Sequence, residues 1–204
     1  MTPPPIPRAI EGGLERRKMN GIILAGGHSS RFGENKAFID INSRFLIERI
    51  VDLLRQIFRK VYIVTNSPRE YKYLGTETVV DIFRERGPLG GIHAGLLASD
   101  SCHNFIAACD MPFLDIGLIR DLADKIEDFD LVVPKFGERL QMLHAFYSKN
   151  CISIIEEQLM ASNLKLRNLL PKVNSKIIEY QNFGQSFMNI NTHADYEEAV
   201  SLVN

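Results

Sequence analysis

The chain has 204 residues, of which 45% are hydrophobic and 24% are charged, and its formal net charge is -1 at pH 7. This length suits one sizeable α/β core, and the balanced charge argues against nucleic acid or an anionic membrane surface as a partner. No apolar run approaches the roughly 20 residues that span a bilayer, and the N-terminus lacks the apolar segment of a signal peptide. We therefore expect a cytoplasmic protein that binds small molecules.

Residues 1–18 differ in composition from the rest of the chain. They contain Pro3-Pro4-Pro5, Gly12-Gly13 and a charged run over 15–18, and they show no apolar periodicity. Such a segment buries too little apolar surface to offset its ordering entropy, so we expect a disordered tail. We expect one domain over residues 19–204, with Met19 as the natural start or residues 1–18 as an appendage.

Between Met19 and residue 134, short β-branched runs alternate with segments of helical period. The predicted strands are 22–25, 61–65, 79–80, 105–109 and 131–134, and the predicted helices are 43–59, one that begins near Gly90, and 115–127. Strands that alternate with helices predict an α/β fold, a mostly parallel sheet covered by helices on both faces.

The last third departs from this regularity. Residues 140–147 predict a strand that we expect to be antiparallel, followed by helices near 150–160 and 164–170 and a strand over 177–180. The last helix is predicted to open at Thr192, because its hydroxyl and the Asp195 carboxylate have the spacing of a capping box.

The loop over residues 24–36 is the most informative segment. It follows the first predicted strand and contains Gly26-Gly27, Arg31, Gly33 and Lys36. Glycines let backbone N–H groups approach an anion closely, and the two cations add charge, so the loop predicts a phosphate-binding site. The alternative is an ordinary tight turn with solvated charges.

Better-known phosphate loops do not fit this spacing. Glu34-Asn35 separates Gly33 from Lys36, whereas a Walker A loop has lysine directly after its last glycine. The adjacent pair Gly26-Gly27 breaks the G-x-G-x-x-G pattern of dinucleotide-binding loops. The sequence therefore supports neither a P-loop ATPase nor a dehydrogenase.

Polar side chains follow three further predicted strands. Asn66, Asp81 and Asp110 each come after a strand, and ligands of open α/β sheets collect at the carboxyl ends of strands. The alternative for each is turn formation, which applies most to Asn66 and least to Asp110. An ionised aspartate suits Mg²⁺, or Mn²⁺ in its place, so Asp110 is the predicted metal ligand.

Other kinds of site lack their signatures. Cys102, Cys109 and Cys151 show no C-x-x-C spacing, and the five histidines form no H-x-x-x-H pair, which argues against a zinc site. No G-x-S-x-G elbow surrounds Ser29 and Ser30, so serine hydrolase chemistry is not indicated.

Several motifs, in order, resemble those of the molybdenum cofactor guanylyltransferases, within the pyrophosphorylase-like nucleotidyltransferase superfamily. They are Leu24-Ala25-Gly26-Gly27 with Ser30-Arg31, Gly33 and Lys36, then Asp81, residues 87–91 (GPLGG), residues 109–112 (CDMP) and residues 189–192 (NINT). The resemblance spans roughly residues 19–204. It implies a three-layer, Rossmann-like fold of the nucleotide-diphospho-sugar transferase type.

The resemblance implies GMP transfer from GTP to the terminal phosphate of molybdopterin, with release of pyrophosphate. It implies catalytic roles for Lys36, Asp110 and Arg31 beside Mg²⁺. A phosphate monoester has its second pKa near 6, so the attacking group is largely ionised at pH 7 and needs no general base. A molybdoenzyme or a chaperone is the implied transient partner. The residues expected to bind nucleotide are Leu24, Ala25, Gly26, Gly27, Lys36, Asn66 and Asp81.

The molybdopterin site is expected near residues 188–191. Asn189 and Asn191 alternate with apolar residues, which predicts both amides on one face of a short strand. Lys165, Arg167 and Lys172 could meet the phosphate, although a solvated helix face explains these basic residues better.

Guanine is favoured over cytosine by resemblance, because related cytidylyltransferases tend to carry LAAG where this chain has Leu24-Ala25-Gly26-Gly27. Asp81 could also accept hydrogen bonds from guanine N1 and N2. A cytidylyltransferase acting on molybdopterin, a sugar-phosphate nucleotidylyltransferase and a non-catalytic nucleotide-binding module remain alternatives. Asn35 departs from the aspartate usual before the lysine, which predicts weaker order of the loop in the free protein.

Overall fold

The computed structural model describes residues 19–26 and 35–203. The predicted tail over 1–18, together with Gly27, Arg31 and Gly33, lies outside these residues. In the described ranges eight strands form one sheet in the order β3-β2-β1-β4-β7-β5-β6, with β8 beside β5. The strands are β1 (Asn20–Leu24), β2 (Lys60–Val64), β3 (Glu77–Val79), β4 (His103–Ala108), β5 (Leu131–Phe136), β6 (Arg139–Leu140), β7 (His144–Ser148) and β8 (Ser175–Tyr180).

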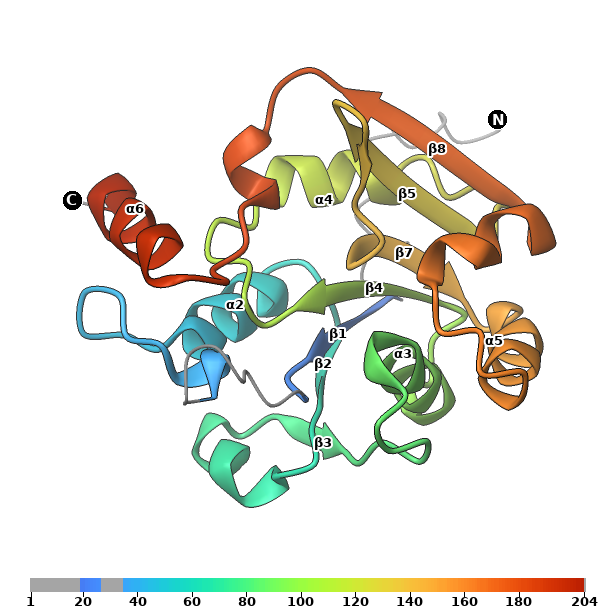
Figure 1. Ribbon diagram of the computed structural model, residues 1–204, viewed down its shortest axis with the longest axis horizontal. Coiled ribbons are helices and arrows are strands. Elements are labelled where there is room, and N and C mark those ends of the chain that lie inside the picture. The colour runs from blue at the N-terminus through green and yellow to red at the C-terminus, as the bar shows by residue number, and fades with distance from the viewer. Residues whose placement is uncertain (1–18, 27–34, 204) are drawn as a thin grey trace, which may run out of the picture.

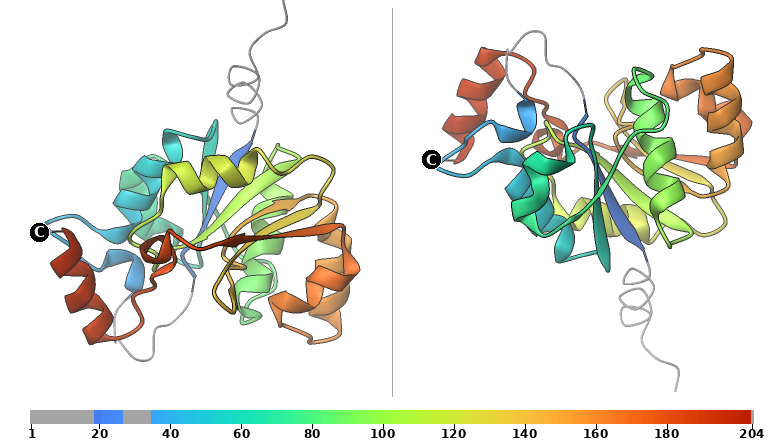
Figure 2. Two further views of the ribbon diagram at one scale, coloured as in Figure 1. Left: turned by 90° about the horizontal axis from the view of Figure 1, so that it is seen from above. Right: turned by 90° about the horizontal axis from the view of Figure 1, so that it is seen from below.

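Helices cover both faces of this sheet. The α-helices are α2 (Leu46–Arg55), α3 (Gly87–Ala98), α4 (Ile116–Ala123), α5 (Cys151–Met160) and α6 (His193–Val203). Short 3₁₀ turns lie at η1 (Lys36–Phe38), η2 (Pro68–Leu74), η3 (Leu166–Lys172) and η4 (Gly184–Phe187). Figure 1 shows β3 and β8 at opposite sides of the molecule, and Figure 2 shows helices above and below the sheet.

Two apolar cores separate the three layers. On one face, α2 and α4 bury residues such as Ile50 and Leu122 against the sheet. On the other face, α3 and α5 bury residues such as Ile92 and Ile155. The predicted α/β class is therefore confirmed, including its mainly parallel sheet.

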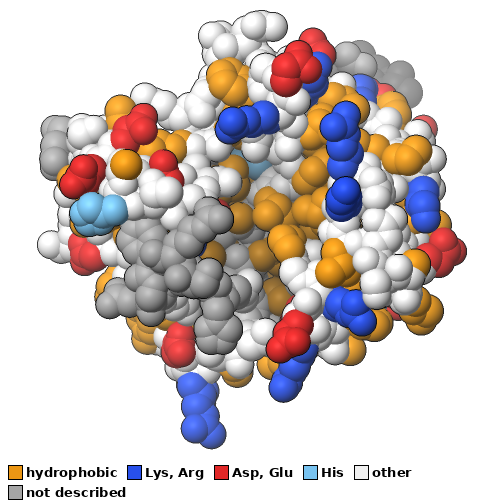
Figure 3. Space-filling view, in the orientation of Figure 1, with side chains coloured by type: hydrophobic (Ala, Val, Ile, Leu, Met, Phe, Trp, Pro, Cys, Tyr) orange, Lys and Arg blue, Asp and Glu red, His pale blue; other side chains and the backbone are white. Residues whose placement is uncertain are grey.

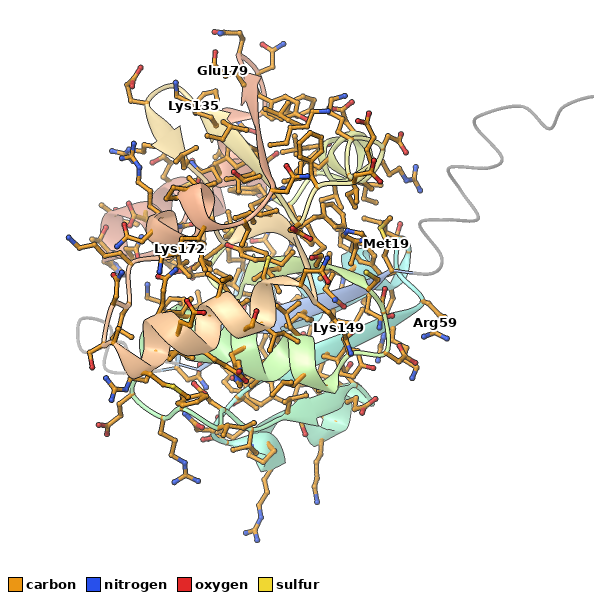
Figure 4. The ribbon with its side chains drawn as sticks, turned by 90° about the vertical axis from the view of Figure 1, so that its right-hand side faces the viewer. Met19, Arg59, Lys135, Lys149, Lys172 and Glu179 are labelled. Carbon is orange, nitrogen blue, oxygen red and sulfur yellow. The ribbon has the colours of Figure 1, made fainter. Side chains whose placement is uncertain are left out.

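The antiparallel part of the sheet is confirmed at β7, which runs opposite to both β4 and β5. The predicted strand over 140–147 is wrong in extent, because a turn at 141–143 divides it into β6 and β7. The His144 N–H donates to the Gln141 carbonyl oxygen across that turn, at 3.0 Å. Strand β8 pairs with β5 at the outer edge, where Lys135 and Glu179 lie together, with Nζ 2.9 Å from Oε1 (Figure 4).

Three predicted helices also change. The helix expected over 115–127 ends at Ala123. The helix expected over 43–59 is shorter, because Asn42 and Ser43 have positive φ values of 53° and 60° and form a turn before α2. The helix expected over 164–170 is the 3₁₀ turn η3, which contains Pro171 and therefore cannot form a regular α-helical ladder.

The capping box predicted for the last helix is present. The Asp195 carboxylate accepts the Thr192 N–H at 2.7 Å, and the Thr192 hydroxyl oxygen accepts the Asp195 N–H at 3.2 Å. Helix α6 packs through Ala199 on a small cluster that includes Ile41, Leu46 and Ile190. This packing returns the end of the chain to the segment that follows η1.

Candidate active site

The register of the parallel strands aligns the predicted site residues at one edge. Leu24 lies opposite Val64 of β2 and Ala108 of β4, and Val64 lies opposite Val79 of β3. The segments that follow these strands therefore leave the sheet at the same level. They carry Gly26, Asn66, Asp81 and Asp110.

Lys36 contacts the segment that follows β4 and the segment that follows η4. Its Nζ atom lies 3.2 Å from Oδ2 of Asp110 and 2.7 Å from Oδ1 of Asn191. The Lys36 and Asp110 side chains are 19% and 18% exposed, so the ion pair is partly shielded from water. The Ile190 N–H donates to the Asp110 carbonyl oxygen at 2.9 Å, which fixes the segment carrying Asn191 against the end of β4.

The second carboxylate oxygen of Asp110 is available to a ligand. Oδ1 is buried and has no hydrogen-bond partner among the described residues. A buried carboxylate oxygen without a partner is costly, so a bound cation would remove that cost. No group of three or more His, Cys, Asp or Glu side chains gathers for a metal in the described ranges. The fit is therefore to an ion such as Mg²⁺, which takes one or two carboxylates and completes its shell with phosphate oxygens and water.

Asn35 anchors the end of the glycine-rich loop. Its Oδ1 accepts the Ala37 N–H at 3.2 Å, and its Nδ2 donates to the Tyr71 hydroxyl at 3.0 Å. Tyr71 in turn donates to the Ala25 carbonyl oxygen at 3.2 Å, and burial raises its pKa to about 12, which keeps it a donor. The asparagine itself is therefore held in place, while the order of residues 27–34 stays a prediction.

Both backbone groups of Ala25 make hydrogen bonds within the protein. Its N–H donates to Val64 and its carbonyl oxygen accepts from Tyr71, while its side chain and that of Leu24 are buried. Gly26 is exposed, and a Cβ atom added there would stand 3.9 Å from the Val64 carbonyl oxygen, the nearest atom among the described residues beyond its chain neighbours. Among the described residues, no atom therefore crowds the exposed backbone at Gly26.

Asp81 lies against the start of α3. Its Oδ1 accepts the Phe83 N–H at 2.9 Å, and burial raises its pKa above the ordinary range. A Cβ atom at Gly90 would stand 3.0 Å from both Asp81 carboxylate oxygens. Within the described part of the chain, no hydrogen bond joins Asp81 or Asn66 to Lys36 or Asp110, although the four residues share an edge.

A pocket of about 450 Å³ adjoins the Lys36 pair. Asn189 and Asn191 both line it, but the short strand predicted for them is absent, since residues 188–191 follow η4 as extended chain without a strand partner. Of the three predicted basic residues, Arg167 lines the pocket and Lys165 and Lys172 do not. Figure 3 shows this face hollowed, with hydrophobic side chains on its wall and basic ones on its rim.

Sequence reasoning missed most of the pocket lining. The missed residues come from the β5–β6 hairpin, the turn before β7 and η4, and they are Glu138, Arg139, Leu140, Gln141, Met142 and Phe187. The pattern of residues 139–142 predicted a strand and gave no indication of a pocket. The turn at 141–143, which presents these side chains to the pocket, has no glycine or proline to reveal it.

The chain matches the MobA-like NTP transferase domain over residues 21–176. It belongs to this family. A probable molybdenum cofactor guanylyltransferase of Clostridium perfringens strain 13 is 38% identical over 194 residues, which cover 90% of this chain and 96% of that protein. A molybdenum cofactor guanylyltransferase of Desulfosudis oleivorans is 36% identical over 193 residues, covering 91% and 96%.

Solved structures of nucleotidyltransferases share the fold. Molybdopterin-guanine dinucleotide biosynthesis protein A from Archaeoglobus fulgidus superposes with a TM-score of 0.79 at 24% identity, over 91% of this chain and 98% of that one. The 4-diphosphocytidyl-2C-methyl-D-erythritol synthase of Anaerococcus prevotii gives 0.72 at 15% identity, over 93% and 97%. The nucleotide-diphospho-sugar transferase type of fold, expected from sequence, is confirmed.

Proposed function

We propose that this protein transfers GMP from GTP to the terminal phosphate of molybdopterin, giving the guanine dinucleotide cofactor and pyrophosphate. The observation that carries the proposal is the Lys36 ammonium, which bonds at once to Asp110 at the nucleotide edge of the sheet and to Asn191 in the wall of the pocket. Relatives at 36–38% identity bear the name of this activity. Two substrate sites that meet at one lysine suit a transfer between two phosphates.

The transfer forms a bond between a molybdopterin phosphate oxygen and the α-phosphorus of GTP, and it breaks the α–β phosphoanhydride bond. The nucleophile is largely ionised at neutral pH, so no base has to remove a proton from it. The protein needs to align the two phosphates and to offset their negative charge. Lys36 can contact the phosphates with its third N–H donor, and Arg31 and the glycine-rich loop would add charge and amides. Asp110 would hold Mg²⁺ through its unpaired Oδ1, and a bound Mg²⁺ would neutralise charge that develops on pyrophosphate.

The pocket beside Asn191 is the proposed binding site of the second substrate, molybdopterin. Phe187 and Met142 provide apolar wall for a flat pterin ring, and Asn189, Asn191 and Arg167 provide polar partners. Asn191 faces the Lys36 end, so a ligand in the pocket can direct its phosphate toward Asp110 and Lys36. This arrangement favours molybdopterin over a sugar phosphate, because a sugar phosphate presents no extended flat ring.

Guanine selection is assigned to Asp81. A carboxylate is an acceptor, and guanine presents N1–H and N2–H donors that cytosine lacks in that arrangement. The Asp81 carboxylate stands at the same sheet edge as Gly26 and is held by the Phe83 N–H. The reaction is proposed to occur in the cytoplasm, with a molybdoenzyme or a chaperone as the transient acceptor of the product. In the described part of the chain, no helix has the length and apolar character that crossing a membrane requires.

A thermal-shift panel with GTP, CTP, ATP and UTP, each with Mg²⁺, tests the nucleotide assignment. A ligand at 100 times its Kd stabilises the folded protein by about 2.7 kcal/mol. We expect GTP to raise the melting temperature most and Asp81→Asn to reduce that preference. An equal or larger shift with CTP would contradict the guanylyl assignment.

A further inference from the structure

His144 is a buried polar residue whose hydrogen bonds are missing. It opens β7, its side chain is 0% exposed, and neither Nδ1 nor Nε2 has a partner among the described residues. Burial lowers its pKa to about 3, so the imidazole is neutral and carries one donor and one acceptor. Leaving both unpaired in the interior is unfavourable. The site therefore has two hydrogen bonds to offer to a group from outside the described chain.

The two aromatic neighbours of the imidazole indicate from which side a ligand could approach it. The ring centroid of Phe105 lies 5.0 Å from that of His144, and Phe105 is 0% exposed in the core. Phe187 lies 5.2 Å away on centroids, but it also lines the pocket of about 450 Å³. Phe187 is thus a wall shared by the pocket and His144.

The chain before His144 lies along the same pocket. Gln141 and Met142 both line it, and the His144 N–H is fixed by the Gln141 carbonyl oxygen at 3.0 Å. Phe187 belongs to the four-residue turn η4, whose first neighbour, Phe183, has a φ of 70°. The pocket can therefore reach the imidazole through the rotation of one side chain on a short turn, without displacing a strand of the sheet.

We propose that His144 is a specificity-determining residue of this pocket, which pairs with the pyrimidinone edge of a pterin ring when Phe187 turns aside. This inference rests on the proposed function. A pterin edge presents N–H and carbonyl groups, so it can donate to the unprotonated nitrogen of a neutral imidazole or accept from the protonated one. The two ring nitrogens point in different directions, so one edge pairs with one of them. An anion fits this position poorly, because the imidazole is uncharged and its neighbours are aromatic.

A pair of apolar substitutions separates recognition from support of the fold. His144→Leu and His144→Phe remove both hydrogen-bonding atoms from a place where the protein supplies no partner. Neither is expected to lower the melting temperature by more than a few degrees, and removal of an unpaired polar group can raise it. His103→Leu is the matched control, since His103 lies on β4 outside the pocket lining and its Nε2 pairs with the Phe129 carbonyl oxygen.

The experiment measures three quantities for the parent and each variant: the GTP-induced thermal shift, the KM for molybdopterin, and the affinity for 6-hydroxymethylpterin by fluorescence titration. We expect both His144 variants to keep the GTP shift while the KM and the pterin Kd rise about tenfold, as for loss of one hydrogen bond. The His103 variant is expected to match the parent in all three.

A His144 variant that keeps the GTP shift and also keeps the parent KM and pterin affinity would overturn the inference. Loss of the GTP shift in both His144 variants would overturn it too, by showing that the imidazole supports the fold. Failure of the proposed function has a different signature, because then the parent itself would transfer no GMP and bind no pterin.

Discussion

Lys36 and Asp110 are 74 positions apart, and Lys36 and Asn191 are 155 apart, yet their side chains are in contact. The contact depends on two backbone restraints. The Ile190 N–H bonds to the Asp110 carbonyl oxygen, and the Asp195 carboxylate accepts the Asn191 N–H at 2.8 Å. The same N–H bonds from Asn191 and Thr192 hold the pKa of Asp195 below its usual range, so this cap stays ionised at neutral pH.

Asp110→Asn tests the metal ligand at this contact. The substitution conserves shape but removes the charge that attracts both Lys36 and a divalent cation. We expect a loss of about 100-fold or more in kcat, with a melting temperature near that of the parent. Steady-state pyrophosphate release and a melting curve measure the two effects. Turnover within about threefold of the parent, a barrier change below about 1 kcal/mol, would contradict the assignment.

For single residues, the sequence predicted those features that depend on neighbours close along the chain. The box of Thr192 and Asp195 is visible as a three-residue spacing, and Asp110 follows directly on an apolar run. The Lys36–Asn191 bond and the exposure of Phe187 to the pocket were not predictable, because both depend on how distant segments return to the sheet. The periodicity of apolar residues does not predict which distant segments meet.

Among the elements, the start of α3 contains two glycines, Gly90 and Gly91, at which an added side chain would meet neighbouring atoms. A Cβ atom at Gly90 would lie 2.8 Å from the Phe83 carbonyl oxygen and 3.0 Å from the Asp81 carboxylate. At Gly91 the nearest atom is Cδ2 of the flexible Leu24 side chain, at 3.2 Å. The two neighbouring glycines therefore differ in what a methyl group would displace.

Gly90→Ala and Gly91→Ala form a matched pair. In both, alanine improves helix propensity by about 1 kcal/mol, but only Gly90→Ala must move a backbone carbonyl group and Asp81. We expect Gly90→Ala to destabilise the protein by about 1–3 kcal/mol and to weaken GTP binding, with a much smaller effect for Gly91→Ala. Urea denaturation and GTP titration measure both. Equal effects of the two substitutions would count against the role given to the Asp81 contact.

At the opposite end of the strands, Asp100 joins β1, β2 and the end of α3. The Lys60 ammonium, the Asn20 amide and the Arg59 guanidinium all bond to its carboxylate, at 2.9, 2.8 and 2.5 Å, and they hold its pKa well below the usual range. Figure 4 shows Arg59 beside Met19, the residue before β1. This cluster ties the strand starts together, away from the site.

Asp100→Asn is expected to change the acid stability of the protein. A carboxyl group whose pKa is depressed by folding stabilises the native state above its unfolded pKa of about 3.9, and this stability is lost as the pH falls. The parent should therefore melt higher than the variant at pH 7, and the difference should shrink below about pH 4. Melting curves from pH 7 to pH 2 measure it, with the exposed Asp128→Asn as the charge-matched control. A difference that is constant with pH would contradict this account.

Apolar periodicity predicted some of the helices and strands and failed for others. The strands β1, β2 and β4 and the helices α2 and α4 agree with the apolar pattern, since each buries one face or both against a regular neighbour. The segment 140–147 alternates like one strand, but the turn held by the Gln141 carbonyl oxygen divides it. Residues 188–191 also alternate, although their partners are the pocket and the backbone of Asp110 rather than a strand.

For the whole molecule, the sheet order places Gly26, Asp81 and Asp110 after the ends of β1, β3 and β4, at one edge, and the β5–β6 hairpin, the turn before β7 and η4 line the pocket beside them. In the proposed function, the parallel half serves the nucleotide and the mixed half serves the acceptor. Alternation of strands and helices predicted the first half. The second half has short, irregular elements whose packing decides their form.

Deleting residues 1–18 tests whether the domain begins at Met19. These residues lie outside the described ranges, and proline, glycine and charge dominate their sequence. We expect the shortened chain to keep its melting temperature within about 2 °C and its GTP affinity unchanged. A loss of several degrees, or of GTP affinity, would show that the segment contributes to the working molecule.

The most direct test of the central claim is the identity of the product. The protein is incubated with molybdopterin, Mg²⁺ and either GTP or CTP, and the products are identified by mass spectrometry while pyrophosphate is measured in parallel. We predict the guanine dinucleotide from GTP, with one pyrophosphate released for each transfer and little product from CTP. A cytosine dinucleotide formed at an equal or higher rate, or binding of GTP with no pyrophosphate released, would contradict the account.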